Sequence, residues 1–243
     1  MTAQTPSKPV SALGRLRGLA ALEGPLATTV LTVFQYFLVS VSFWGCLVPA
    51  FAFLALVGWQ PTHVALWLGA LSLLPVVPAV YALLRSSRRL LAEREEARAG
   101  RVFWTSFAQA CRALAWAALA VGVLALLLAY DVTLFGASDA MLLFAVGAAV
   151  VVLVLVIGVC AVAATRSEHK PIDVTTAAVK AIARRPHVAL SWLLLVGLGI
   201  GAMTLPLVGS VLAMFLPALL GVGIHICNDA LRLPLNDETR KIP

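Results

Sequence analysis

The sequence predicts an all-α, polytopic integral membrane protein, and three observations support this class. Hydrophobic residues make up 61% of the 243 residues and charged residues only 12%, about half of the roughly 25% found in soluble domains. A soluble domain of this size could not cover so much apolar surface with polar side chains. The charged residues are also clustered between long uncharged runs. This clustering indicates a lipid bilayer and argues against a nucleic-acid partner.

Six apolar runs are long enough to cross a bilayer core, which needs about 20 helical residues. The predicted spans cover about 28–57, 64–84, 113–130, 140–164, 188–205 and 207–227. Runs such as 150–157 lack the polar alternation of a barrel strand, so in lipid they must be helical. The chain is expected to form one membrane domain, 25–228, with tails at 1–24 and 229–243 and long connections at 85–112 and 165–187.

The last two spans require a turn between them. Residues 188–227 would reach about 60 Å as a single helix, twice the thickness of the membrane core. The chain must therefore turn back, and 204–209 is the expected place. A re-entrant half-helix is the alternative there and would leave five spans. Five prolines are expected to bend or end helices and to free carbonyl groups: Pro49, Pro75, Pro78, Pro206 and Pro217.

The basic residues predict the orientation of the chain. With six spans, all 18 Lys and Arg residues fall in the two tails, the connection 85–112 and the connection 165–187. Basic residues avoid the outer side of the membrane, so both termini are expected in the cytoplasm. The opposite side would carry only Asp131 and Asp139 as charged residues. Five spans would place the basic C-terminal tail outside, which favours the even count.

The first long connection is predicted to contain an amphipathic helix that lies at the membrane surface. Gly100 is expected to break a charged extension of the second span, and a helix over 102–112 follows it. Phe103, Phe107 and Cys111 then share one face at intervals of four residues. Such a helix buries its apolar face at the level of the lipid headgroups.

The second long connection has a similar pattern. Pro171 and Asp173 indicate a helix start, with Asp173 as the expected cap, and Pro186 is expected to end or kink the helix. An apolar stripe runs along it, formed by Val174, Ala178, Ala181 and Ile182.

Both connections carry residues suited to docking. One interpretation is that the arginines only set the topology. The other is a surface for a cytoplasmic partner or for anionic lipid. The candidate docking residues are Arg88, Arg89, Arg101, Phe103, Trp104, Phe107, Lys180, Arg184 and Arg185.

Polar chemistry inside the spans is scarce. The only candidate is His225, with Asn228 and Asp229 one turn further along. These residues are interpreted either as interfacial side chains or as a weak polar site for a proton, a substrate or a lipid. Residues 197–202 match the nucleotide-binding pattern GxGxxA, but they lie in an apolar span and do not follow a strand. Gly197 and Gly201 are therefore predicted to form a GxxxG contact between helices.

No metal site or cofactor is expected from the sequence. The four cysteines show no CxxC spacing, and the four histidines show no HExxH or other ligand pair. The cysteines are expected to be apolar packing residues without disulfides. They are Cys46, Cys111, Cys160 and Cys227.

Several segments resemble one known family. Residues 72–83, SLLPVVPAVYAL, resemble the signature of the YesL-like family of bacterial integral membrane proteins, and 103–110, FWTSFAQA, resembles its aromatic segment. Asp131 matches an acidic residue of the family, and 176–186, TAAVKAIARRP, is similar to a third element, whereas the family's Thr-x-Gly is missing. The resemblance implies association with carbohydrate uptake systems. It assigns no catalytic residue.

Three functional hypotheses follow. The leading one is a non-enzymatic inner-membrane protein that acts as an accessory or partner subunit, associated through the resemblance with carbohydrate uptake. The alternative is a transporter or permease subunit for a neutral or apolar solute, with a path lined by the proline breaks. The third is an enzyme acting on lipid through His225, Asn228 and Asp229. The sequence leaves the oligomeric state open.

Overall fold

A computed structural model describes residues 25–58, 60–93, 98–136, 138–165, 170–206 and 209–230. All regular structure in these residues is helical, and six helical segments are long and apolar enough to cross a membrane. The predicted all-α membrane-spanning fold is therefore confirmed. The helices are α2 (Pro25–Leu56), α3 (His63–Ser72), α4 (Val76–Glu93), α5 (Ala99–Ala113), α6 (Ala115–Phe135), α7 (Asp139–Thr165), α8 (Pro171–Arg184), α9 (Pro186–Met203) and α10 (Gly209–Ala230). The tails 1–24 and 231–243 lie outside the described residues.

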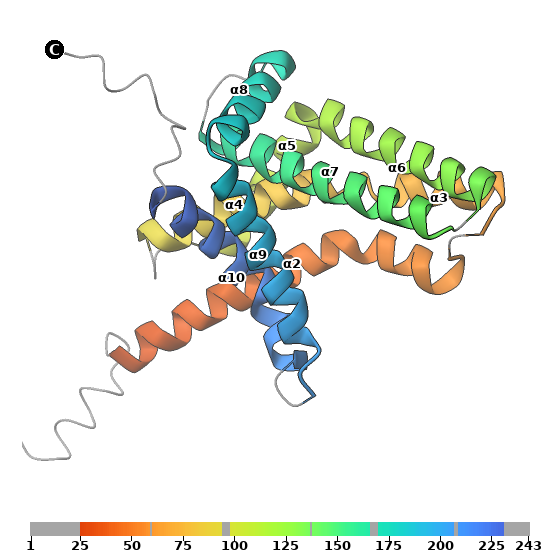
Figure 1. Ribbon diagram of the computed structural model, residues 1–243. Helices are drawn as coiled ribbons and strands as arrows, with labels where there is room; N and C mark the ends of the chain where they lie inside the picture. Colours follow the sequence, from red (N-terminus) through yellow and green to blue (C-terminus); the bar gives the residue numbers. More distant parts are fainter. Residues whose placement is uncertain are drawn as a thin grey trace, which may run out of the picture.

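Helix α4 is the centre of the arrangement. It packs against α2, α5, α6, α7 and α10. Figure 1 shows two groups of helices that diverge from it, because α3, α6 and α7 extend to the right of the view while α9 and α10 extend downward. The long helix α2 crosses between the two groups and contacts α3 on one side and α10 on the other.

The second span, His63–Glu93, is divided at Pro75, one of the prolines that the sequence predicted to bend or end a helix. Helix α3 starts at a Thr62 cap, whose hydroxyl accepts a hydrogen bond from the backbone N–H of Ala65 at 3.3 Å. It ends at Ser72, and tight turns follow at Leu73 and Leu74. Pro75 follows these turns without an N–H to donate to a preceding carbonyl, and the next helix begins at Val76.

Pro49 and Pro217 remain inside helices, and α2 repairs the break that Pro217 creates in α10. Pro217 has no N–H to offer the carbonyl of Ala213, four residues earlier. The Trp44 indole N–H donates to that carbonyl instead, at 3.0 Å. One turn away on α2, the Ser40 hydroxyl accepts the N–H of Ala218 at 3.2 Å. Pro217 therefore joins α10 to α2.

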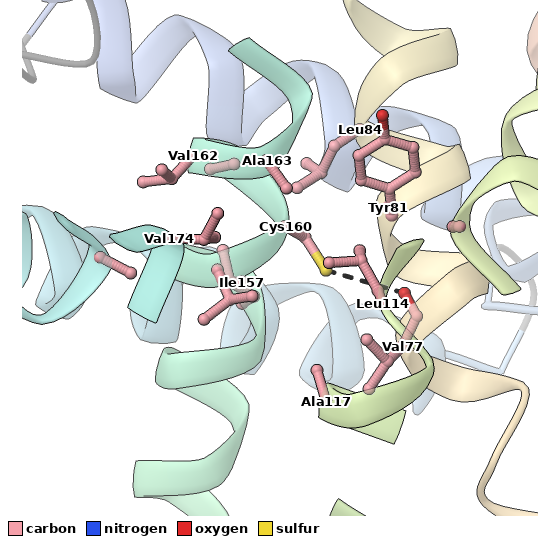
Figure 2. Packing of buried hydrophobic residues seen from close by; sticks show 14 of the residues in the cluster. Val77, Tyr81, Leu84, Leu114, Ala117, Ile157, Cys160, Val162, Ala163 and Val174 are labelled. Atoms are coloured by element: carbon pink, nitrogen blue, oxygen red, sulfur yellow. Dashed lines mark hydrogen bonds between the residues drawn. The ribbon is translucent and has the colours of Figure 1, made fainter. Parts of the chain in front are cut away.

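The buried core between the two groups is formed by α4, α6, α7, α8 and α9. Figure 2 shows Cys160 at its centre, with its thiol 3.7 Å from the carbonyl oxygen of Val77. Leu114 points into the same core and is fully buried at the break between α5 and α6. The bend between the connecting helix α5 and the span α6 is therefore held in place by the burial of Leu114.

Two sequence predictions about the connections are wrong in detail. Gly100 does not break the chain, because it is the second residue of α5, and the left-handed residue before that helix is Arg98 with φ 39°. The Ala99 N–H at this helix start is bound by the Gln35 side-chain oxygen of α2, at 2.6 Å. Asp173 is not the cap of α8 either. Lys170 occupies that position without a side-chain hydrogen bond, and Asp173 lies in the first turn.

The apolar stripe of α8 packs as predicted. Val174, Ala178 and Ala181 are buried, and Ile182 is half-buried. Helix α7 accommodates this helix because Gly158 has no side chain, and a Cβ there would come within 2.9 Å of the Ile182 side chain. That α5 and α8 lie at the membrane surface stays a prediction.

The chain turns back between α9 and α10, so this region forms two membrane-length helices. The glycine of α9 that packs closely against α10 is Gly199, which the sequence did not single out. A Cβ on Gly199 would lie 3.0 Å from the Leu216 side chain of α10, whereas Gly197 and Gly201 face open space. The predicted GxxxG contact has no partner helix among the described residues, so it stays a prediction.

Gly199→Val should destabilise the α9–α10 hairpin, because the added methyl groups overlap Leu216. We expect a loss of about 1–3 kcal/mol in the free energy of unfolding, measured by denaturant titration in detergent micelles. Gly197→Val is the matched control, and its effect should stay within about 0.5 kcal/mol. Equal losses in both variants would contradict this packing.

Candidate functional site

The predicted docking residues divide between two platforms. Helix α5 packs on α4 and α2, whereas α8 packs on α7 and α9. On the first platform Arg88, Arg89, Arg101 and Trp104 are exposed, Phe107 is half-buried and Phe103 is fully buried. On the second platform Lys180 and Arg184 are exposed and Arg185 is half-buried. The sequence prediction treated all of these basic and aromatic residues as docking residues, whereas the structure gives them different roles.

Phe103 is an internal anchor and offers no surface to a partner. It is buried in a second cluster with Val39 of α2 and Leu90 of α4. Trp104 packs edge-on against Phe103, with 5.8 Å between the ring centroids, yet 52% of its surface is exposed. The aromatic group of α5 therefore has a buried half that holds the helix in place and an exposed half at Trp104.

Arg85 links α4 to α5, a role that the sequence analysis missed. Its guanidinium donates to the Gln109 side-chain oxygen at 2.7 Å and to the Tyr81 hydroxyl at 3.0 Å. Tyr81 and Arg85 are four residues apart on one helix, a spacing in the sequence that indicates contact between the two side chains. Nothing in the sequence indicated Gln109 as the third member.

His225 and Asn228 hold helices together. The His225 Nε2–H donates to the Leu84 carbonyl of α4 at 2.7 Å. The Asn228 side-chain oxygen accepts the indole N–H of Trp192 in α9 at 2.9 Å. Asp229 is exposed at the end of α10. These contacts give both buried polar side chains a structural role, and a lipid-directed activity at this place stays a hypothesis.

Further buried polar groups lie along the seam between α4 and α10. Ser87 is fully buried, and a Cβ on Gly221 would collide with its hydroxyl. The Ser87 hydroxyl and the Asn228 side-chain nitrogen make no hydrogen bond in the described structure. Close approach of the two helices here depends on two small residues, Ser87 and Gly221, which the sequence analysis did not select.

The four cysteines are free thiols that differ in burial. Cys46 and Cys160 are buried as expected and Cys227 is half-buried, whereas Cys111 is exposed, contrary to the prediction. Partial desolvation raises the pKa of the Cys111 thiol, so this group is neutral at pH 7. Among the described residues, no three His, Cys, Asp or Glu side chains lie together as a candidate metal site.

Surface grooves of the described helices are lined mainly by apolar side chains. One lies between α2 and α3, beside Pro49 and Leu68. Another lies at the break in the second span, where Pro75 and Pro78 face Phe107 of α5 and Leu119 of α6.

No family model, curated protein or solved structure matches this chain. The resemblance to the YesL-like family therefore stays a prediction that rests on the sequence segments alone.

Asn228→Leu should destabilise the protein, because it leaves the buried Trp192 indole N–H without an acceptor. We expect a cost of about 1–3 kcal/mol in unfolding free energy, measured by thermal or denaturant unfolding in micelles. Asp229→Asn, at the adjacent exposed position, should be close to neutral. Wild-type stability in Asn228→Leu would refute the assigned contact.

Proposed function

We propose that this chain is a non-enzymatic partner subunit of the inner membrane, with both termini in the cytoplasm, and that it binds another membrane protein through α9. The observation that carries the proposal is the outer stripe of α9. Leu190, Leu194, Gly197 and Gly201 recur at intervals of three or four residues on one side of the helix. Leu190 is 65% exposed and Leu194 is 73% exposed, and both glycines face open space.

A small-residue stripe of this kind suits a second helix better than it suits lipid. Glycines four residues apart let two helix backbones approach closely, and this approach adds van der Waals contact between the helices. Lipid chains make such contact without needing a gap between side chains. The chain's own α10 uses the opposite side of α9 through Gly199. The packing of α9 against α10 therefore does not use the outer stripe.

Helix α8 supports the same assignment. It directly precedes α9 and exposes the apolar Val179 next to Lys180 and Arg184. A partner that binds along α9 would also contact this face of α8 at the junction between α8 and α9. Association with a carbohydrate uptake system is the part of the proposal that comes from the family resemblance.

Site-specific photo-crosslinking in native membranes tests the proposal. A crosslinking residue in place of Leu194 should give a discrete protein adduct, because this position faces the partner. The control is Leu127 on α6, which is also apolar and is 55% exposed, and it should give no adduct. Gly197→Val should remove the Leu194 adduct while leaving the fold intact, because valine fills the stripe. Absence of any protein adduct from Leu194 would refute the proposal.

The alternative of a permease subunit is supported by the broken second span, since broken helices line solute paths in transporters. The two functions differ in what the purified chain does alone. If it is a partner subunit, proteoliposomes containing only this chain should take up neutral sugars no faster than empty liposomes, as followed with radiolabelled solutes. Saturable uptake would support the permease hypothesis instead.

A further inference from the structure

The outer side of α8 carries an apolar stripe opposite the side that packs on α7 and α9. The buried side is formed by Val174, Ala178 and Ala181. With about 3.6 residues per turn, Ile172, Val179 and Ala183 point the other way. All three are exposed, and Ile172 is 76% exposed. Figure 1 shows α8 at the upper edge of the molecule. The stripe is therefore open to a contact from outside the chain.

One flank of the same helix is charged, and the sign of the charge changes along it. Asp173, Lys180 and Arg184 are exposed and recur after seven and four residues, which places them on one line beside the apolar stripe. Asp173 lies in the first turn of α8 and Arg184 in the last. These two side chains are about 16 Å apart along the helix axis, so they cannot pair with each other. The flank presents a negative end and a positive end to whatever binds there.

A second copy of this chain matches such a surface. Two copies with the same topology in one membrane are related by a two-fold axis along the membrane normal, and every contact between them then occurs twice. A helix that lies across this axis, as predicted for α8 at the membrane surface, meets its counterpart antiparallel. Asp173 of each copy then faces Arg184 of the other, and the two Val179 side chains meet near the axis. The charged flank is therefore complementary to itself.

Helix α9 leads to the same partner. It begins at Pro186, directly after α8. The two α9 helices of such a pair cross the membrane in the same direction, so their outer stripes can meet. Gly197 and Gly201, which face open space in the single chain, would then let the two backbones approach closely. One partner accounts for both the α8 surface and the α9 stripe.

We propose that the protein bound by α8 and α9 is a second copy of this chain, paired through antiparallel α8 helices and parallel α9 helices. The inference rests on the proposed function, because it names the membrane protein that α9 binds. Charge complementarity selects this occupant over lipid. Lipid headgroups have no fixed pattern that would place a positive and a negative charge about 16 Å apart, the helical distance between Asp173 and Arg184.

Exchange of these two charges tests the pairing. Asp173→Arg and Arg184→Asp each place like charges opposite one another at two symmetric positions, so each variant alone should self-associate about tenfold more weakly than the wild type. In a mixture of the two variants, the introduced arginine faces the introduced aspartate, and the native Arg184 faces the native Asp173. Mixed pairs should therefore form as well as wild-type pairs. Copurification of two differently tagged copies from solubilised membranes measures both effects.

Arg101→Asp, which reverses an exposed arginine of α5, is the matched control and should leave self-association unchanged. Rescue in the mixture cannot come from better folding, because neither variant is altered by mixing. Wild-type association in both single variants would overturn the inference. So would the lack of rescue, which is the result expected if the two charges act only within their own helix.

Disulfide trapping in native membranes gives a test that needs no charge reversal. Val179→Cys in a Cys111→Ser background should link two copies on oxidation with copper phenanthroline, because the two positions meet near the axis. Thr105→Cys in the same background, at an exposed position of α5, should not. Failure of Val179→Cys to link two copies would contradict the antiparallel pair.

The mass of the Leu194 adduct separates this inference from the proposed function. An adduct with twice the mass of the chain supports the second copy. An adduct with a different protein alone would overturn the second copy as partner and leave the proposed function standing, whereas absence of any protein adduct would overturn both.

Discussion

The constraint on which the rest of this structure depends is that backbone polar groups have no water to bind within the membrane. Each helix break must therefore be repaired from inside the protein. At Pro217 the repair comes from Trp44 and Ser40 on α2. The same two hydrogen bonds that satisfy the α10 backbone also hold α10 against α2. A residue that weakens one helix thus becomes a joint between two helices that are far apart in the sequence.

The polar side chains follow the same logic. Arg85 is bound by Tyr81 and Gln109, His225 by the Leu84 carbonyl, and Asn228 by Trp192. Apart from the Arg85–Tyr81 contact inside α4, each of these contacts joins two helices. Polar groups in an apolar environment are costly without partners, and here they connect helices.

The proposed functions lie on surfaces that these internal contacts leave exposed. The α9 stripe lies opposite the side that contacts α10, and the α5 groove lies beside the break where α3 cannot continue into α4. Both places have a specific shape, which is a strip of small residues on α9 and an apolar groove beside α5. Exposed leucine and valine side chains also cover outer sides of α6 and α7.

The class of protein, the six spans and the turn before α10 followed from the sequence, because they depend only on hydropathy, length and charge summed over many residues. The apolar stripe of α8 was also predictable, since an amphipathic helix has one face that must be buried. The sequence could not identify Gly199 as the glycine of α9 that packs against α10. A helix that is apolar all round has no preferred face, so only the position of its neighbours determines which side is covered. The tertiary structure decided those contacts, and with them the surfaces that remain for a partner or a lipid.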